Sequence, residues 1–260
     1  MLSKSIEGKI MRALVEFDMI QDGDKILIGL SGGKDSMLLT YALATFQNRL
    51  AKKFSLAALT IDPNFDENFH INAAKLTEFC HTLGIEHKIE SVDIADVIHL
   101  QKKSPCFTCA YFRRAAINRV ANEIGANKVA YAHHLDDAVE TFLMSLLSSG
   151  QLTTFLPKTF LDRTGITVIR PLIYLREFEV KSFIAANNFD VLKSPCPIDG
   201  TTNRQTVKNL IVDLRKIFPD LFNHLTAAMR KNSIGDLWEP VKTRKQMRET
   251  YFAYIHRQQI

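Results

Sequence analysis

Leu30-Ser31-Gly32-Gly33-Lys34-Asp35-Ser36 follows an apolar run that begins at Lys25, and it precedes a segment, 36–44, with the pattern of a helix. A strand, a glycine turn and a helix N-terminus in this order form the layout of a phosphate-binding loop. Adjacent glycines allow a sharp turn and a close backbone approach to an anion. The first helical amides lack intrahelical partners, and the helix dipole there favours negative charge. The stretch 31–36 therefore predicts a phosphate site, with Lys34 as its cation and Ser31 and Ser36 as hydroxyl donors. It is not G-x-x-x-x-G-K-[ST], which excludes the triphosphate P-loop.

Strands and helices alternate on both sides of this loop. The apolar patterns predict strands near 25–30, 54–61, 87–92, 128–132 and 166–169, and helices near 5–20, 36–44, 71–83, 108–124, 139–147, 176–187, 203–217 and 219–231. Residues 150–165 have no regular pattern and are expected to form an irregular loop. This alternation predicts an α/β fold: an open, mostly parallel, doubly wound sheet of about five strands, with an N-terminal helix and C-terminal helices.

Polar side chains follow several of these predicted strands. The loop 31–36 follows the first, Asp62 the second and His133 the fourth. In open parallel sheets, ligands bind beyond the carboxyl ends of the strands. We therefore expect these residues to share one nucleotide site.

The composition fits a soluble globular protein. The chain has 260 residues, of which 46% are hydrophobic and 23% charged, with a net charge of +5. No apolar run approaches the ~20 residues that span a bilayer, and the first residues lack the apolar core of a signal peptide. We expect a cytoplasmic protein without membrane contact. The positive charge is compatible with a polyanionic partner.

The segment His133-His134-Leu135-Asp136-Asp137-Ala138-Val139-Glu140-Thr141 begins at the end of a predicted strand. Carboxylates at a helix start can simply cap the helix. Paired histidines and aspartates are denser than capping requires, and near a phosphate loop Asp136 and Asp137 are suited to hold Mg²⁺. Further along the chain, Arg170 has a fixed positive charge suited to phosphate, or to a surface salt bridge.

Four cysteines are present, and three of them are candidates for one site. Cys106 and Cys109 form a CxxC pair at a predicted helix start, Cys196 lies in a proline-flanked loop, and Cys80 lies on an apolar helix face, where a buried structural role is expected. A thiol–disulfide centre favours a thioredoxin-like context, which is absent. Structural zinc needs a fourth ligand, for which His99 or His134 is available. Three cysteines with one open position suit an iron–sulfur cluster.

SGGKDS resembles the PP-loop of the ATP pyrophosphatase superfamily, which splits ATP between its α and β phosphates. Together with CxxC, HHxDDxxET, Arg170-Pro171-Leu172 and the later Pro195-Cys196, it resembles the tRNA 2-thiocytidine biosynthesis (TtcA) family from about residue 5 to 231. The resemblance implies an adenine nucleotide alpha hydrolase-like fold. It also implies ATP-dependent adenylation of the C2 carbonyl of cytidine 32 in the tRNA anticodon loop, followed by sulfur transfer that releases AMP and pyrophosphate.

The resemblance also implies the site residues. ATP would be held by Ser31, Gly32, Gly33, Lys34, Asp35, Ser36, Asp62, His133 and Arg170, and catalysis would use Lys34, Asp35 and Asp137. A [4Fe–4S] cluster would be held by Cys106, Cys109 and Cys196, and Mg²⁺ by Asp136 and Asp137. The implied partners are tRNA, a sulfur donor such as a cysteine desulfurase, and a second copy of the chain in a homodimer.

The expected organisation has three parts: residues 1–22 as a packed helix, 23–195 as the ATP-binding domain with an inserted CxxC segment, and 196–260 as a helical extension with a basic tail. Basic residues near the CxxC and on the late helices favour RNA contact there: Arg113, Arg114, Arg119, Arg204, Lys208, Arg215 and Lys216. Two alternatives remain open. One is a PP-loop modification of another base, by thiolation or lysidine-type amination, and the other is a zinc-stabilised nucleotide- or RNA-binding module without catalysis.

Overall fold

The computed structural model describes residues 1–65, 69–94, 105–192, 196, 203–230, 243, 245–246 and 248. His99, the residues beside Cys196 and most of the predicted basic tail lie outside them. The chain forms two compact units, Met1–Pro219 and Asp220–Ile260, which we describe separately. The three predicted domain ranges stay predictions.

The first unit is built on a six-stranded sheet with the strand order β3-β2-β1-β4-β6-β5. All neighbouring pairs are parallel except β5 with β6. The strands are β1 (Lys25–Gly29), β2 (Ser55–Asp62), β3 (Glu86–Ser91), β4 (Lys128–Ala130), β5 (Lys158–Leu161) and β6 (Ile166–Ile169). The order runs outward in both directions from β1 and β4, so the topological switch point lies between these two strands. This confirms the predicted open, mostly parallel α/β sheet.

One strand was not predicted. β5 lies within the range 150–165 that we expected to be irregular, and it pairs antiparallel with β6 at the edge of the sheet. A tight turn joins the two strands, in which Gly165 adopts a φ of +68° and donates its N–H to the Leu161 carbonyl. The sequence did not predict this strand, because its four residues are mostly half-exposed and show little apolar periodicity. Backbone pairing with β6 stabilises it instead.

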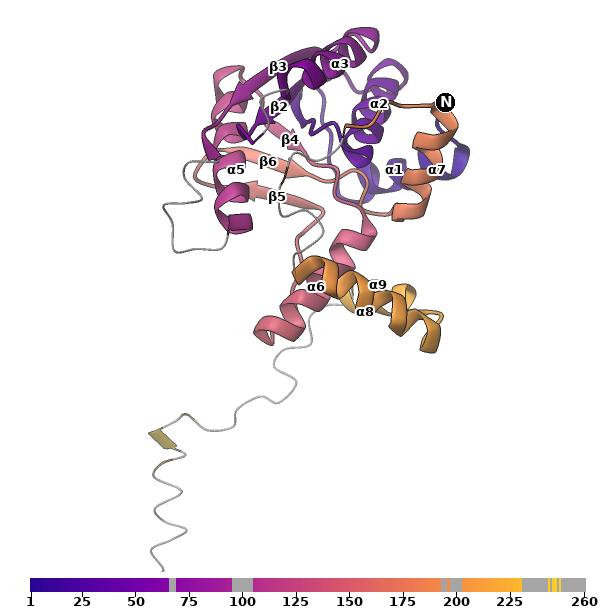
Figure 1. The fold of residues 1–260 in the computed structure, drawn as a ribbon, viewed down its shortest axis with the longest axis vertical. Helices are drawn as coiled ribbons and strands as arrows, with labels where there is room; N and C mark the ends of the chain where they lie inside the picture. The colour runs from indigo at the N-terminus through magenta and orange to yellow at the C-terminus, as the bar shows by residue number, and fades with distance from the viewer. Residues whose placement is uncertain are drawn as a thin grey trace, which may run out of the picture. The chain divides into compact units, whose positions relative to one another are not determined.

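Helices cover both faces of the sheet (Figure 1). α5 lies on one face, and α2 lies with α7 on the other. The helices of this unit are α1 (Lys4–Glu16), α2 (Lys34–Arg49), α3 (Phe69–Thr82), α5 (Pro105–Glu123), α6 (Leu135–Ser149), α7 (Glu177–Asn187) and α8 (Asn203–Ile217). The second unit contains α9 (Leu221–Arg230). These helices match the predicted segments, with shifts of a few residues at their ends.

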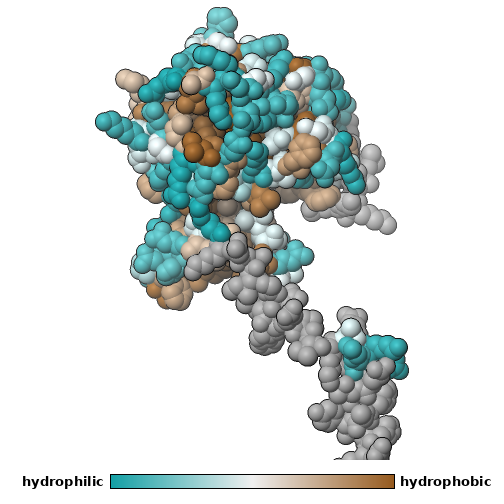
Figure 2. Space-filling view, turned by 180° about the vertical axis from the view of Figure 1, so that it is seen from behind, coloured by the Kyte–Doolittle hydropathy of each residue, from teal (hydrophilic) through white to brown (hydrophobic). Residues whose placement is uncertain are grey.

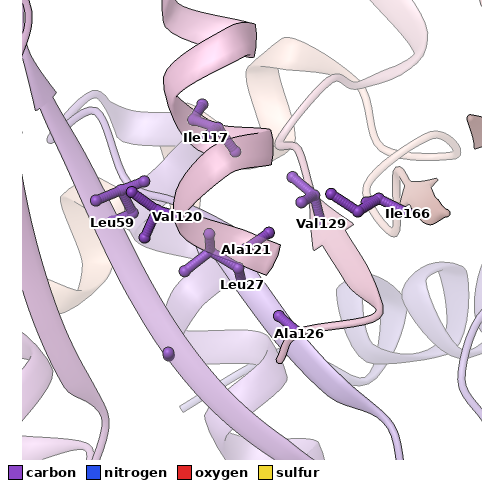
Figure 3. Close-up of a cluster of buried hydrophobic side chains, with 9 residues drawn as sticks. Leu27, Leu59, Ile117, Val120, Ala121, Ala126, Val129 and Ile166 are labelled. Atoms are coloured by element: carbon purple, nitrogen blue, oxygen red, sulfur yellow. The ribbon is translucent and has the colours of Figure 1, made fainter. Parts of the chain in front are cut away.

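A buried apolar cluster attaches α5 to the sheet (Figure 3). Side chains of α5 contact those of four parallel strands and of the turn before β4: Leu27, Ala57, Leu59, Ile117, Val120, Ala121, Ala126, Val129 and Ile166. Burial of apolar area is the main stabilising term in such packing. Because α5 carries the CxxC pair in its first two turns, this cluster also fixes where the two cysteines lie relative to the strand ends.

Hydrophilic side chains cover most of the face seen in Figure 2, with hydrophobic ones at only a few places. Within the described ranges, no helix combines the length and the apolar character needed to cross a bilayer.

Candidate functional site

The loop between β1 and α2 has the geometry of an anion cradle. Gly32 adopts a φ of +78°, and Gly33 is the N-cap of α2 without a side-chain capping bond. Ser36 Oγ donates to the Gly33 carbonyl at 2.8 Å, and Ser31 Oγ lies 3.2 Å from Ser36 Oγ. The two serines thus brace the turn from inside. The helix N-terminus is left to be capped by a ligand instead of by its own side chain.

Leu192 lies against this cradle. Its N–H donates to the Gly32 carbonyl at 3.0 Å, and its side chain would lie 2.9 Å from a Cβ placed on Gly32. The segment that follows α7 is therefore attached to the phosphate loop, and Cys196 comes four residues after Leu192.

Lys34 is held between two carboxylates. Its Nζ lies 2.8 Å from Asp35 Oδ2 and 3.2 Å from Glu177 Oε1. Burial opposes the charge on Lys34, but the hydrogen bond and charge of Asp35, with those of Glu177, raise its pKa. For Glu177, burial is outweighed by Lys34 and Lys208, which lower its pKa to about 2. The pair therefore stays fully ionised at neutral pH, and phosphate oxygens of a ligand can replace the carboxylates around Lys34.

Asp62 lies at the carboxyl end of β2, beside β1. It is 2% exposed, and its Oδ1 accepts a hydrogen bond from the Asn64 N–H at 2.9 Å. The structure thus brings Asp62 to the same edge of the sheet as the cradle, as the sequence predicted.

His134 joins the second motif to the cradle. It is the N-cap of α6 and forms a capping box with Asp137: Asp137 N donates to His134 Nδ1 at 3.4 Å, and His134 N donates to Asp137 Oδ2 at 2.9 Å. Its Nε2 lies 3.5 Å from Asp35 Oδ1. Capping therefore accounts for part of this motif, and the same residue spans the switch point between β1 and β4.

His133 lies in an aromatic cluster at the ends of β4 and β6. Its ring is 5.9 Å from that of Tyr131 and 5.0 Å from that of Phe155. Burial lowers the pKa of His133 to about 4, so the imidazole is neutral at neutral pH. The Arg170 guanidinium lies 4.9 Å from the Phe155 ring centre and donates to the Leu156 carbonyl. His133 Nδ1 and Arg170 Nε are buried without a hydrogen-bond partner in the described part of the chain, which marks this cluster as a place for ligand contact.

Asp136 and Asp137 are both engaged by arginine. Asp136 accepts two hydrogen bonds from Arg176, at 3.1 and 3.2 Å, and one from the Glu177 N–H at 2.9 Å. Asp137 Oδ1 lies 3.3 Å from Arg204 Nη1. In this arrangement Asp136 ties α6 to the start of α7, which favours a positioning role, and the Mg²⁺ assignment stays a prediction.

Glu140 is a site residue to which the sequence assigned no role. It is 2% exposed and lies 3.1 Å from Arg204 and 3.6 Å from Lys208, both on α8. Lys208 also lies 3.6 Å from Glu177. Arg204 and Lys208, predicted as RNA contacts, therefore pair with carboxylates of α6 and α7. The sequence offered one signal of this role, since Glu140 is a charged residue among the apolar positions of α6 that face inward. Its partners could not be predicted, because they lie more than 60 positions away in the chain.

The three candidate cysteines lie near one another, while Cys80 lies elsewhere. Cys106 and Cys109 are in the first two turns of α5; Cys106 is exposed, whereas Cys109 and Cys196 are partly buried. Burial raises the pKa of Cys109, the Arg113 cation lowers it, and the charges of Cys196 and Cys106 raise it. Cys106 and Cys196 thus both act electrostatically on the Cys109 thiol. By contrast, burial alone raises the pKa of Cys80 to about 12.

The donor set fits an iron–sulfur cluster in its chemistry, because thiolates are the usual ligands of such clusters. Among the described residues, no three side chains of His, Cys, Asp or Glu are arranged closely enough to ligate a metal ion as they stand. The thiols are thus brought together without being preset at ligating distances.

Residues 2–214 match the family described as the PP-loop domain. The tRNA-cytidine(32) 2-sulfurtransferase of Geobacter sulfurreducens is 34% identical over 231 residues, covering 87% of this chain and 89% of that protein. The Syntrophotalea carbinolica protein of the same name is 36% identical over 233 residues, covering 87% of each chain.

Among solved structures, the U34-tRNA thiolase NcsA from Methanococcus maripaludis with its [4Fe–4S] cluster is similar, with a TM-score of 0.73 and 25% identity over 86% of this chain and 77% of that one. The NMN synthetase of Francisella tularensis shares the fold, with a TM-score of 0.51, 18% identity and coverage of 92% of this chain and 100% of that one. The family match covers most of the chain, and the similarity to the sulfurtransferases extends over nearly their whole length. The chain therefore belongs to the PP-loop domain family and, within it, to the tRNA-cytidine(32) 2-sulfurtransferases.

Proposed function

We propose that the protein is an ATP-dependent tRNA sulfurtransferase that converts cytidine 32 of the anticodon loop to 2-thiocytidine. The observation that carries this function is the similarity to proteins of that name over nearly their whole length. The phosphate cradle at the switch point supports it, because this is where an open parallel sheet binds a nucleotide.

The reaction has two steps, and neither oxidises nor reduces the base. The C2 carbonyl oxygen of the cytosine attacks the α-phosphorus of ATP, and the bond to pyrophosphate breaks. Sulfide then adds at C2, and AMP leaves with the former carbonyl oxygen. The first step is needed because a carbonyl oxygen is a poor leaving group, whereas AMP is a good one.

The cradle contributes to the first step. The amides of the α2 N-terminus and the Lys34 ammonium would bind the phosphates and stabilise the charge on departing pyrophosphate. Asp35 and Glu177 keep Lys34 charged and oriented until the nucleotide arrives. Asp62 would bind the nucleoside part of ATP. We propose Asp137 as a catalytic carboxylate, and Asp136 and Asp137 together as the ligands of a magnesium ion.

Cys106, Cys109 and Cys196 would hold a [4Fe–4S] cluster, as their electrostatic interaction and thiolate chemistry support. When bound, a cluster with one iron free of cysteine supplies a place for sulfide. The Leu192 contact with Gly32 would keep the third ligand near the activated base. A cysteine desulfurase is our proposed source of the sulfur, the cytoplasm the proposed location, and a homodimer the proposed assembly.

The function is tested by complementing a deletion strain with single variants and measuring 2-thiocytidine in its tRNA by mass spectrometry. We expect Cys106→Ala, Cys109→Ala and Cys196→Ala to abolish the thionucleoside and the visible absorption of the cluster. Cys80→Ala is the matched control, because Cys80 is buried away from the site, and it should retain both. An active Cys196→Ala variant would contradict the cluster assignment.

The activation step is tested separately by AMP release in vitro with unmodified tRNA. Lys34→Ala and Asp35→Ala should lose it, whereas the cysteine variants should retain it, since they act after adenylation. Retained ATP turnover in both cradle variants would exclude the loop as the nucleotide site. AMP release by the wild type without any thionucleoside would favour an amine nucleophile over sulfide.

A further inference from the structure

The first half of α5 carries two large aromatic side chains on its solvent side. Phe107 is 50% exposed and Tyr111 is 58% exposed, and Arg114 is exposed as well. Because these residues follow one another at spacings of four and three, they lie on one face of the helix. The apolar residues that α5 buries against the sheet, among them Ile117 and Val120, belong to its later turns.

This face is not explained by the packing of α5. An amphipathic helix normally presents charged and polar side chains to solvent, and α5 does so further along, where Arg119 pairs with Glu90 and Glu123. At its start the exposed positions instead include two large aromatic side chains, Phe107 and Tyr111. The Tyr111 ring also contacts that of Phe112 edge-on, with centroids 5.4 Å apart, which restricts its orientation.

Charge and position connect this face to the site. Arg114 Nε donates to the Ala110 carbonyl at 3.0 Å, so the guanidinium stays alongside the helix. Its charge opposes the burial that raises the pKa of Tyr131 to about 12, and it adds to the burial that lowers the pKa of Arg170. Arg114 therefore lies near the aromatic cluster at the ends of β4 and β6. The face thus begins within the CxxC pair, where Phe107 lies between the two cysteines, and its arginine acts electrostatically on that cluster.

We propose that Phe107, Tyr111 and Arg114 form the surface on which unpaired bases of the tRNA anticodon loop stack while the target base enters the site. The proposal rests on the proposed function and names the RNA-binding surface that it requires. Aromatic rings receive unstacked bases irrespective of their sequence, and an adjacent arginine contributes charge for the backbone or a further stacking plane. A folded protein could also bind these exposed rings. RNA is favoured because the rings lie beside an arginine, which can pair with phosphate or stack on a base.

The test is the affinity of the cluster-containing enzyme for an unmodified tRNA transcript, measured by fluorescence anisotropy over a range of salt concentrations. Tyr111→Leu should weaken binding about tenfold, because the ring on which a base stacks is lost; a tenfold change corresponds to about 1.4 kcal/mol. Tyr111→Phe should bind like the wild type, since it keeps the ring. Phe107→Leu should resemble Tyr111→Leu. Phe160→Leu is the matched control, since Phe160 is 60% exposed on the edge strand β5.

The salt dependence separates stacking from charge. The aromatic variants should leave the slope of log affinity against log salt unchanged, whereas Arg114→Gln should reduce its magnitude by about one. Each variant is first checked for ATP affinity and cluster absorption, so that a folding defect is not read as lost stacking.

Two results would overturn the proposal. One is wild-type tRNA affinity in both Tyr111→Leu and Phe107→Leu. The other is unchanged tRNA affinity with thiolation lost only when a protein sulfur donor replaces inorganic sulfide, which would assign the face to that donor. Failure of the wild-type enzyme to bind tRNA would instead contradict the proposed function itself.

Discussion

Gly32 carries two separate constraints at a single position. Its φ of +78° lies in the region that L-residues adopt at a cost, and Leu192 occupies the space that a side chain would need. Gly33, by contrast, has an extended conformation, and the nearest atom to a Cβ there is Ser31 Oγ at 3.4 Å. The two glycines of the loop therefore serve different purposes: one makes the turn and receives Leu192, and the other starts the helix.

We expect Gly32→Ala to weaken ATP binding about tenfold or more, equivalent to about 1.4 kcal/mol. The added Cβ must displace either Leu192 or the cradle, so the amides move from their positions around the phosphates. Isothermal titration calorimetry with ATP measures the change.

Gly23→Ala is the matched control, because Gly23 has a φ of +81° but nothing within 4 Å of its Cβ position. Both variants should lose about 1–2 kcal/mol of folding stability from the positive φ. Only Gly32→Ala should lose ATP affinity, and equal ATP affinity in the two variants would contradict the role of the Leu192 contact.

At the scale of elements, α6 organises the site through its acidic side chains. Asp137 closes its capping box with His134, Asp136 binds Arg176 and the first amide of α7, and Glu140 binds Arg204 and Lys208 of α8. One helix thus orients two others by ion pairs. Because Glu177 and Lys208 extend these pairs to Lys34, the packing of α8 is connected to the cradle.

We expect Glu140→Gln to loosen α8 selectively. Burial raises the pKa of Glu140, whereas the charges of Lys208 and Arg204 lower it. The carboxylate therefore depends on both cations to stay ionised. A neutral amide loses the charge-assisted bonds, at a cost of about 1–2 kcal/mol. Hydrogen exchange followed by mass spectrometry should show faster exchange in α8, with β1 and β4 unchanged. Glu123→Gln, whose partner is the exposed Arg119, should change little; unchanged exchange in α8 of Glu140→Gln would disprove the connection.

At the scale of the whole first unit, a buried ion pair joins the N-terminal segment to the centre of the sheet. Lys128 on β4 lies 2.6 Å from Asp24 before β1, and its Nζ donates to the Met19 carbonyl at 2.8 Å. Both side chains are about 5% exposed. Asn127 also donates to Asp24 at 2.8 Å. Both charged groups have further hydrogen-bond partners besides each other, which is the condition under which a buried ion pair is tolerated.

We expect Asp24→Asn to destabilise the protein by about 3–5 kcal/mol, because it leaves a buried ammonium without a counter-charge. Urea denaturation at neutral pH measures the loss. Asp213→Asn, which removes a pair between side chains about 70% exposed, should cost less than about 1 kcal/mol. A small effect of Asp24→Asn would show that Lys128 reaches solvent.

The same pair predicts the direction of acid sensitivity. Burial raises the pKa of Asp24, but its bonds from Gln21, Lys128 and Asn127 outweigh burial and hold the pKa below its ordinary value. The unfolded chain therefore binds this proton more readily than the folded one. The contribution of ionised Asp24 to the folding free energy is complete above the ordinary carboxyl pKa. It is lost as the pH falls through the lowered pKa of Asp24 in the folded protein. Asp24→Asn should accordingly flatten the decline of stability in acid.

Much of the candidate site could be predicted because its motifs each consist of residues that are close together in the sequence. The cradle, the CxxC pair and the segment 133–141 each lie within ten consecutive residues, and the alternation of strands and helices places them at strand ends. The edge strand β5 could not be predicted, because its four residues are stabilised by pairing with β6. The pairing of Arg204 and Lys208 with carboxylates was also missed, since basic residues on a helix look alike whether they face RNA or an acidic neighbour.

The amino-acid sequence by itself determined the class of fold and the phosphate loop, because both depend on local backbone preferences and apolar periodicity. Only the tertiary structure decided which side chains are partners: Leu192 with Gly32, Glu177 with Lys34 and Glu140 with Arg204. The physical reason is that these contacts join residues far apart in the chain. They form only once burial of the apolar faces has brought their elements together.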